Sequence, residues 1–327
     1  MPACTNRSLR HLAWLATPLL AIAGCAQSAA KAAVPDGATP VRGTQNALVT
    51  PLGALANQSP RQSTRLELAQ DTLIAECMRA RSFTFDVPRL PVPPAGAFVP
   101  NAYGLLSAAT AARQGYGISD SVLIDEKDGQ IGSELQPGAH KPGFTRALVG
   151  TSATARSITL PGGSHVTFNA NGCATIAIGK LYGRNWNTAY FTVSALMFRI
   201  VQGVEASAAW KNAVRAWSEC VRKGYGVSFA NPDAAEASVR KTASAQLAGL
   251  SGTGFAERLK SVRAGEIRLA VIDARCQAGA GLPAAAAKAQ HATELPDEKR
   301  YAADLSVYAE DMRHAARVTA TVLKQKQ

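Results

Sequence analysis

The sequence has 327 residues, which suits one large or two modest domains, and 35 Lys and Arg against 23 Asp and Glu give it a net charge of +12. Its basic residues are scattered singly and are not interleaved with aromatic residues. This argues against nucleic-acid binding, and no nucleic-acid partner is expected. Outside the cytoplasm, the positive charge favours attraction to anionic headgroups or wall polymers, and an ordinary solvated surface is the alternative.

Residues 1–24 are predicted to be a lipoprotein signal peptide. A basic leader precedes an apolar run over residues 12–23, and the run ends in the lipobox Ile22–Ala23–Gly24–Cys25. Diacylglyceryl transfer to the Cys25 thiol and cleavage before it are expected to anchor the protein on the extracytoplasmic face of the cell membrane, since two or three acyl chains bind stably. A plain secretory signal and a membrane-spanning anchor are the alternatives, and the run, which contains Pro18, is short for a span.

Removal of the leader leaves 327 − 24 = 303 residues with a net charge of 33 − 23 = +10. Residues 25–62 are rich in Ala, Gly, Pro, Ser, Thr and Gln and lack a periodic apolar pattern, so they are predicted to be a flexible tether with a reach of about 33 Å. The rest divides into an N-terminal helical half, 63–203, and a C-terminal helical half, 204–327.

Apolar residues recur at helical spacing over most of the chain after the tether. A β-hairpin is predicted near 158–168, where two alternating segments flank Pro161–Gly162–Gly163. The fold is therefore predicted to be mainly α, with disulfide-braced helical domains and one small hairpin. The predicted helices cover residues 64–81, 107–113, 173–181, 188–201, 206–223, 233–246, 255–277 and 296–324, with a proline-rich extended segment at 86–100 and a polar loop at 120–143.

The last predicted helix begins at Pro296, which is followed by two acids, as is typical of a first helical turn. One side of this helix carries an apolar stripe that includes Tyr301 and Tyr308. Such stripes belong to the protein core in most proteins, and docking of a partner protein on this helix is the alternative. Trp210 and Trp217 form a similar stripe, for which we expect a place in the core.

Four cysteines follow Cys25, an even number that is typical of a disulfide framework in an exported chain. Three connectivities are open. The pairing Cys77–Cys173 with Cys220–Cys276 is preferred, because each bond then closes within one half of the chain. None of the four forms a C-x-x-C motif or lies near a histidine at ligand spacing, so no metal site and no cofactor are expected.

Short motifs recur around these cysteines. The motifs are Cys77–Met78 leading to Phe83, Gly172–Cys173 with Tyr182–Gly183, Cys220 leading to Tyr225, and Ala270–Cys276 with Asp273. In them the chain resembles the uncharacterised secreted lipoproteins of actinomycetes, whose pattern includes C-M-x-x-x-G-[FY] and A-x-x-D-x-x-C. Ser82 departs from the glycine of that pattern and Val221 from the methionine. The resemblance implies export, lipidation and disulfides, and it implies no known activity.

Glu266 and Asp273 are the candidate catalytic residues. They lie seven residues apart, and therefore on one face of a predicted helix, beside the apolar residues and Cys276. Buried carboxylates need partners, which could be Arg79, Arg222 or backbone N–H groups. In a different role the two acids could act as an acid/base couple. A non-enzymatic, lipid-anchored binding or structural protein is expected, and a cell-wall-directed hydrolase is the alternative.

Overall fold

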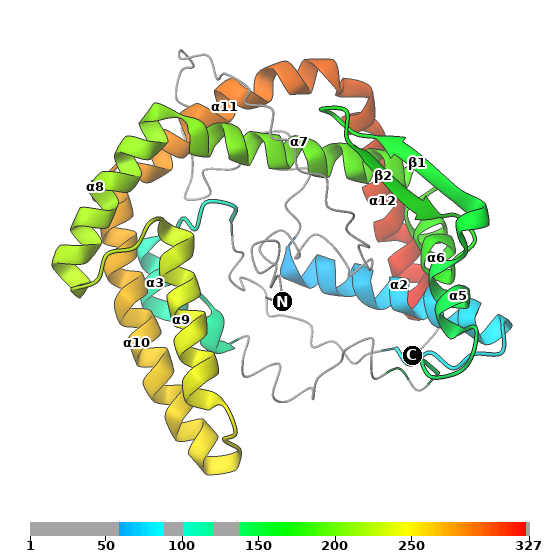
Figure 1. Ribbon diagram of the computed structural model, residues 1–327, viewed down its shortest axis with the longest axis horizontal. Coiled ribbons are helices and arrows are strands. Elements are labelled where there is room, and N and C mark those ends of the chain that lie inside the picture. Colours follow the sequence, from blue (N-terminus) through cyan, green and yellow to red (C-terminus); the bar gives the residue numbers. More distant parts are fainter. Residues whose placement is uncertain (1–58, 88–100, 121–135, 137, 325–327) are drawn as a thin grey trace, which may run out of the picture.

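The computed structural model describes residues 59–87, 101–120, 136 and 138–324, and Figure 1 shows their arrangement. The leader, Cys25 and nearly all of the predicted tether lie outside the described residues, as do large parts of the segments predicted as extended or loop. The described chain is mainly helical with one two-stranded antiparallel sheet, and it carries two disulfide bonds. The predicted fold class is therefore confirmed.

The elements follow the chain in the order of the labels in Figure 1. They are α2 (Pro60–Ala80), α3 (Ala108–Gln114), α5 (Phe144–Val149), a short 3-10 helix (Ser152–Thr154), β1 (Ala155–Thr159), β2 (His165–Asn169), α6 (Cys173–Leu181), α7 (Trp186–Ala206), α8 (Ala208–Tyr225), α9 (Pro232–Leu247), α10 (Gly252–Gly279), α11 (Leu282–Arg300) and α12 (Ala302–Lys324).

Two hydrophobic cores organise these helices. The first, which we call the α2 core, is formed by α2, α5, α6, α12 and most of α7. The second, the α10 core, is formed by α8, α9, α10, the first half of α11 and residues 102–118. Helices α7 and α11 pack along each other and join the two groups (Figure 1). Core membership therefore does not follow the predicted division at residue 203, because residues 102–118 join the α10 core and α12 joins the α2 core.

Each core carries one disulfide. Cys77 on α2 bonds to Cys173 at the start of α6, and Cys220 on α8 bonds to Cys276 on α10. This is the preferred pairing from the sequence, and it is confirmed. The bonds close separations of 96 and 56 residues, and loops of that size correspond to about 4 to 5 kcal/mol of stabilisation each in the chain-entropy account. Two disulfides indicate an extracytoplasmic environment.

Polar caps fix where several helices begin. The side chains of Ser59, Ser207 and Asn231 each accept a hydrogen bond from the backbone N–H three residues further on, at the starts of α2, α8 and α9. Pro60 and Pro232 occupy the first helical position of α2 and α9, where a proline costs no hydrogen bond. Ser207 has an extended backbone, so it ends α7 and begins α8 as a separate helix.

The hairpin is confirmed. Strands β1 and β2 pair antiparallel, with Ile158 opposite Val166, one residue pair in from the turn end of the ladder. Gly162 and Gly163 have φ values of +97° and +86°, which only glycine adopts without strain, so the turn predicted from the sequence closes the hairpin.

The C-terminal prediction needs a correction. Pro296 does not begin the last helix but lies inside α11, and a new helix, α12, begins at Ala302. Asp297, just after the proline, is buried and accepts a hydrogen bond from Arg199 of α7 (3.0 Å), and this ion pair ties α11 to the rest of the protein beyond the proline. Tyr301 is the C-cap of α11: its backbone N–H makes the last helical hydrogen bond, to the carbonyl of Asp297, and its own φ of −112° and ψ of 22° leave the helical conformation. The sequence pattern was that of a first turn, but tertiary packing overrides it.

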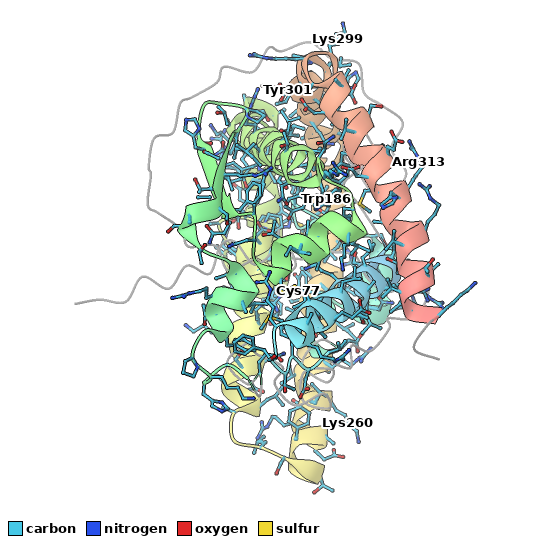
Figure 2. The ribbon with its side chains drawn as sticks, turned by 90° about the vertical axis from the view of Figure 1, so that its right-hand side faces the viewer. Cys77, Trp186, Lys260, Lys299, Tyr301 and Arg313 are labelled. Atoms are coloured by element: carbon cyan, nitrogen blue, oxygen red, sulfur yellow. A yellow bond between two sulfur atoms is a disulfide. The ribbon has the colours of Figure 1, made fainter. Side chains whose placement is uncertain are left out.

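The apolar stripe predicted on the last helix packs within the protein. Tyr308, Leu305 and Val322 of α12 are buried in the α2 core, against α2 and α7. Trp186 of α7 stacks on the ring of Tyr308, with centroids 5.0 Å apart. Figure 2 places Trp186 and Cys77 in this core and Lys260 at the far end of α10. No described helix combines the length and the apolar character needed to cross a bilayer.

Candidate functional site

Glu266 and Asp273, the two acids selected from the sequence, are both sealed inside the α10 core. Their side chains project from one face of α10, as predicted, and the residues are 1% and 0% exposed. A charge buried this deeply is stable only when it is hydrogen-bonded, so the partners of each carboxylate define its role.

Glu266 accepts four hydrogen bonds from one segment of chain. Its Oε1 accepts from the backbone N–H groups of Tyr116 (2.9 Å) and Ile118 (2.8 Å), and its Oε2 accepts from the backbone N–H (3.0 Å) and the hydroxyl of Ser119. Gly115 makes this approach feasible, because a Cβ there would lie 2.6 Å from the Glu266 Cγ. Glu266 therefore clamps residues 115–119 onto α10.

Asp273 joins three elements. Its Oδ1 accepts from the Trp217 Nε1 of α8 (2.7 Å) and from the Gln277 Nε2 of α10 (2.9 Å), and its Oδ2 accepts from the Tyr116 hydroxyl (2.8 Å). Burial raises the pKa of Asp273 to about 6, and the three hydrogen bonds act in the opposite direction. Burial and the neighbouring Asp273 also raise the pKa of Tyr116, so this phenol stays a donor.

These contacts settle which of the expected partners is used. Arg79 and Arg222 are exposed and donate to neither acid, whereas backbone N–H groups hold Glu266. Neither acid lines the pocket described below. The geometry fits carboxylates that hold helices and chain segments together, and it gives no acid/base couple that a substrate can reach.

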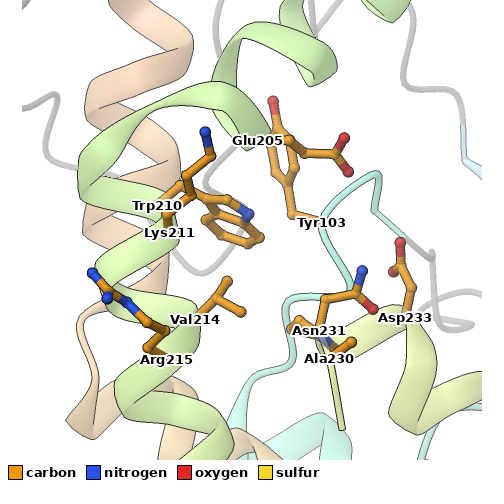
Figure 3. A pocket seen from close by; sticks show the side chains of 10 residues that line it. Tyr103, Glu205, Trp210, Lys211, Val214, Arg215, Ala230, Asn231 and Asp233 are labelled. Carbon is orange, nitrogen blue, oxygen red and sulfur yellow. The ribbon is translucent and has the colours of Figure 1, made fainter.

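A pocket of about 650 Å³ lies at the edge of the α10 core (Figure 3). It opens where the end of α7, the first turns of α8, the start of α9 and the segment after residue 101 meet. Its volume falls within the range of pockets that enclose small molecules. The lining residues are Tyr103, Glu205, Trp210, Lys211, Val214, Arg215, Ala230, Asn231, Pro232 and Asp233.

The local sequence explains why the elements meet here. Asn231 and Pro232 begin α9 and fix its entry. Gly104 has a φ of +62°, and a Cβ there would lie 2.9 Å from both the Pro232 Cβ and an Asp233 carboxylate oxygen, so glycine permits the close approach. Tyr103, just before it, packs against Trp210 of α8, with ring centroids 5.6 Å apart.

Charged groups of both signs surround an apolar floor. Lys211 and Arg215 stand one turn apart on α8, and Figure 3 shows Glu205 and Asp233 on the opposite side, beyond Trp210. Burial raises the pKa of the Glu205 carboxyl. Among the described residues, neither the Glu205 carboxylate nor the Lys211 ammonium group has a hydrogen-bond or ion-pair partner. The pocket therefore presents unused charge to whatever enters it.

Sequence reasoning missed this pocket. It placed Trp210 in a core stripe, which is correct because Trp210 is buried, but it named none of the charged lining residues as a site. The available signal was the pair Lys211 and Arg215 at helical spacing next to an aromatic residue, followed by the helix start at Asn231–Pro232. Nothing in the sequence shows that Tyr103, more than a hundred positions away, completes the wall.

A second pair of acids was also missed. Glu67 and Asp71 lie one turn apart on α2, and burial followed by repulsion from Glu67 raises the pKa of Asp71 to about 7. Glu67 also contributes to the raised pKa of Tyr182, whose ring stacks on Trp186 at 4.0 Å. Within the described ranges, no three metal-binding side chains come together.

Comparison with known proteins yields no match to a family model, a curated protein or a solved structure. The function must therefore be argued from the pocket and the buried acids themselves.

Proposed function

We propose that this protein is a binding protein held by a lipid on the extracytoplasmic face of the cell membrane. One observation carries the binding role: the pocket at Tyr103 and Trp210 is open and is lined by the unpaired side-chain charges of Glu205 and Lys211, whereas Glu266 and Asp273 are enclosed and fully hydrogen-bonded. The alternative, a cell-wall-directed hydrolase that uses these two acids, loses its support because a substrate cannot reach them.

The lipid anchor is supported by the lipobox at Cys25 and by the oxidising environment that two disulfides require. Cells grown with an alkyne-tagged palmitate should label the wild-type protein and its Cys4→Ser variant, because Cys4 leaves with the leader. The Cys25→Ser variant should lose the label. Equal labelling of Cys25→Ser and wild type would overturn the anchor.

The net charge of the mature chain, 33 − 23 = +10, also supports contact between the anchored protein and anionic headgroups or wall polymers. Such contacts are screened by salt, so release of the Cys25→Ser variant from anionic vesicles as the salt concentration rises is the expected behaviour. Retention that does not change with salt would contradict this part of the proposal.

The binding role is tested by filling the pocket. Val214 is half-buried in the wall, and Val214→Trp places an indole in the cavity, whereas Val227→Trp makes the same change at an exposed position that does not line it. A thermal-shift screen of small anions, cations, zwitterions and sugars should find a compound that stabilises wild type and Val227→Trp but not Val214→Trp. No stabilising compound in any class, or stabilisation that survives in Val214→Trp, would overturn binding at this pocket.

A further inference from the structure

We propose that the pocket takes a small zwitterion with an apolar body, namely an amino acid or a short peptide with both termini free. This rests on the proposed binding function and adds the class of ligand to it. The inference comes from how charge is distributed around the pocket, not from the presence of a cavity alone.

The cations are on one wall and the acids are on the other. Lys211 and Arg215 both project from α8, while Glu205 comes from the end of α7 and Asp233 from the first turn of α9 (Figure 3). The rim is therefore neutral in sum, with its two signs separated across the floor. A ligand with a carboxylate at one end and an ammonium group at the other is complementary to both walls at once.

A ligand of a single charge does not fit this arrangement. An anion that reaches Lys211 and Arg215 must also face the carboxylates of Glu205 and Asp233, and a cation meets the reverse problem. Like charges brought together on binding oppose it, so the second wall selects against singly charged molecules. Arg215 donates to the neutral side chain of Asn212, one turn earlier on α8, so it keeps its charge but is held on its own helix, whereas the Lys211 ammonium group has no partner among the described residues.

The floor between the walls is apolar. Trp210 and Val214 come from α8, Tyr103 lies across from them, and Ala230 and Pro232 close the remaining side. Burial of hydrocarbon on such a surface is favourable by about 25 cal/mol for each Å² removed from water. This favours leucine-like side chains over polar ones, and the volume of about 650 Å³ leaves room for more than one residue.

The test is isothermal titration calorimetry of the disulfide-bonded protein, with leucine and trileucine as probes. N-acetyl-trileucine removes the ammonium charge, and trileucine amide removes the carboxylate. At least one zwitterion should bind wild type, and each blocked form of trileucine should bind more weakly, by up to about fivefold, which is the upper end for one exposed charge pair.

Variants assign each end of the ligand to a wall. Glu205→Gln should reduce the preference for trileucine over its N-acetyl form, and Lys211→Ala should reduce the preference over the amide. Lys223→Ala, which removes an exposed cation on α8 that does not line the pocket, should leave both preferences unchanged.

The possible binding results distinguish a failure of the zwitterion proposal from a failure of the proposed binding function. If the blocked peptides bind as tightly as trileucine, the proposal of a zwitterionic ligand is wrong, but the proposed binding function of the pocket still stands. The same holds if neither leucine nor trileucine binds but another class of compound stabilises wild type and not Val214→Trp. If no compound of any class binds, both proposals fall.

Discussion

Replacement of Asp273 by asparagine tests the role assigned to the buried acids. Asparagine keeps the shape of the side chain and its contacts. Its Oδ1 can accept from Trp217 and Gln277 as before, and its Nδ2 can donate to the Tyr116 hydroxyl oxygen. The substitution therefore removes a titratable group, keeps the hydrogen bonds from Trp217 and Gln277, and reverses the one with Tyr116, whose phenol proton loses its carboxylate acceptor. That loss shifts the stability by an amount that does not change with pH.

The size of the effect follows from the pKa of Asp273, which burial raises from 3.8 to about 6. The folded protein binds a proton more tightly than the unfolded chain does, so this carboxyl adds stability below its unfolded pKa and loses that stability as the pH rises through its folded pKa. The difference between the two values corresponds to about 3 kcal/mol. An asparagine side chain does not titrate, so the Asp273→Asn variant should not lose this stability as the pH rises.

The assay is urea denaturation of wild type and Asp273→Asn at several pH values from about 4 to 8, with disulfides intact. Relative to wild type, the free energy of unfolding of the variant should rise by about 2.5 kcal/mol across this range, because part of the change already occurs below pH 4. Because Asp71 titrates in both proteins, the difference between them isolates Asp273. A difference that is constant with pH, or that shrinks as the pH rises, would refute the assignment of a buried, raised-pKa carboxyl.

Glu266→Gln should lower the free energy of unfolding by about 3 kcal/mol at neutral pH, because the N–H₂ group of the new amide would face backbone N–H donors. A loss of less than about 1 kcal/mol in urea denaturation would argue against the role of Glu266 as a clamp. Ser82 has a φ of +65°, so Ser82→Gly should stabilise by about 1 kcal/mol, and a lower melting temperature would contradict this. Replacing Cys220 and Cys276 together by Ala should cost about 4 kcal/mol in urea denaturation, and an unchanged midpoint would exclude a structural role for the bond.

Local sequence patterns predicted much of the fold. The apolar periodicity located most of the long helices, although not the first part of α11, and the glycine turn located the hairpin. The preferred disulfide pairing followed from the rule that each bond closes within a half of the chain, and it is confirmed. Ser82, where the resemblance expects glycine, has a φ of +65°, a conformation that glycine adopts without strain.

The remaining differences arise from contacts between distant parts of the chain. Helix α11 continues through Pro296, where the ion pair between Asp297 and Arg199 ties it to α7, and no local pattern reveals that contact. Residues 102–118 join the α10 core through the Glu266 clamp, although they lie in the predicted N-terminal half. Helix α5 is only six residues long, too short for periodicity to mark it.

The candidate site was predicted only in part. The sequence identified Glu266 and Asp273 as inward-facing acids and offered backbone N–H groups as partners, which is what Glu266 uses. It could not identify the pocket, because Tyr103, Glu205 and Asp233 come from separate segments that tertiary packing brings together. Single charged residues on helices are ordinary surface features in a sequence, and only the folded structure shows that a cavity lies between these ones.

Intact-protein mass spectrometry of the protein purified from its native host tests the central claim most directly. The account predicts a chain that begins at Cys25, carries a diacylglyceryl group and contains two disulfides. An N-terminus with the leader retained and no lipid, together with four free thiols, would contradict the lipid anchor and the oxidising location on which the proposed function depends.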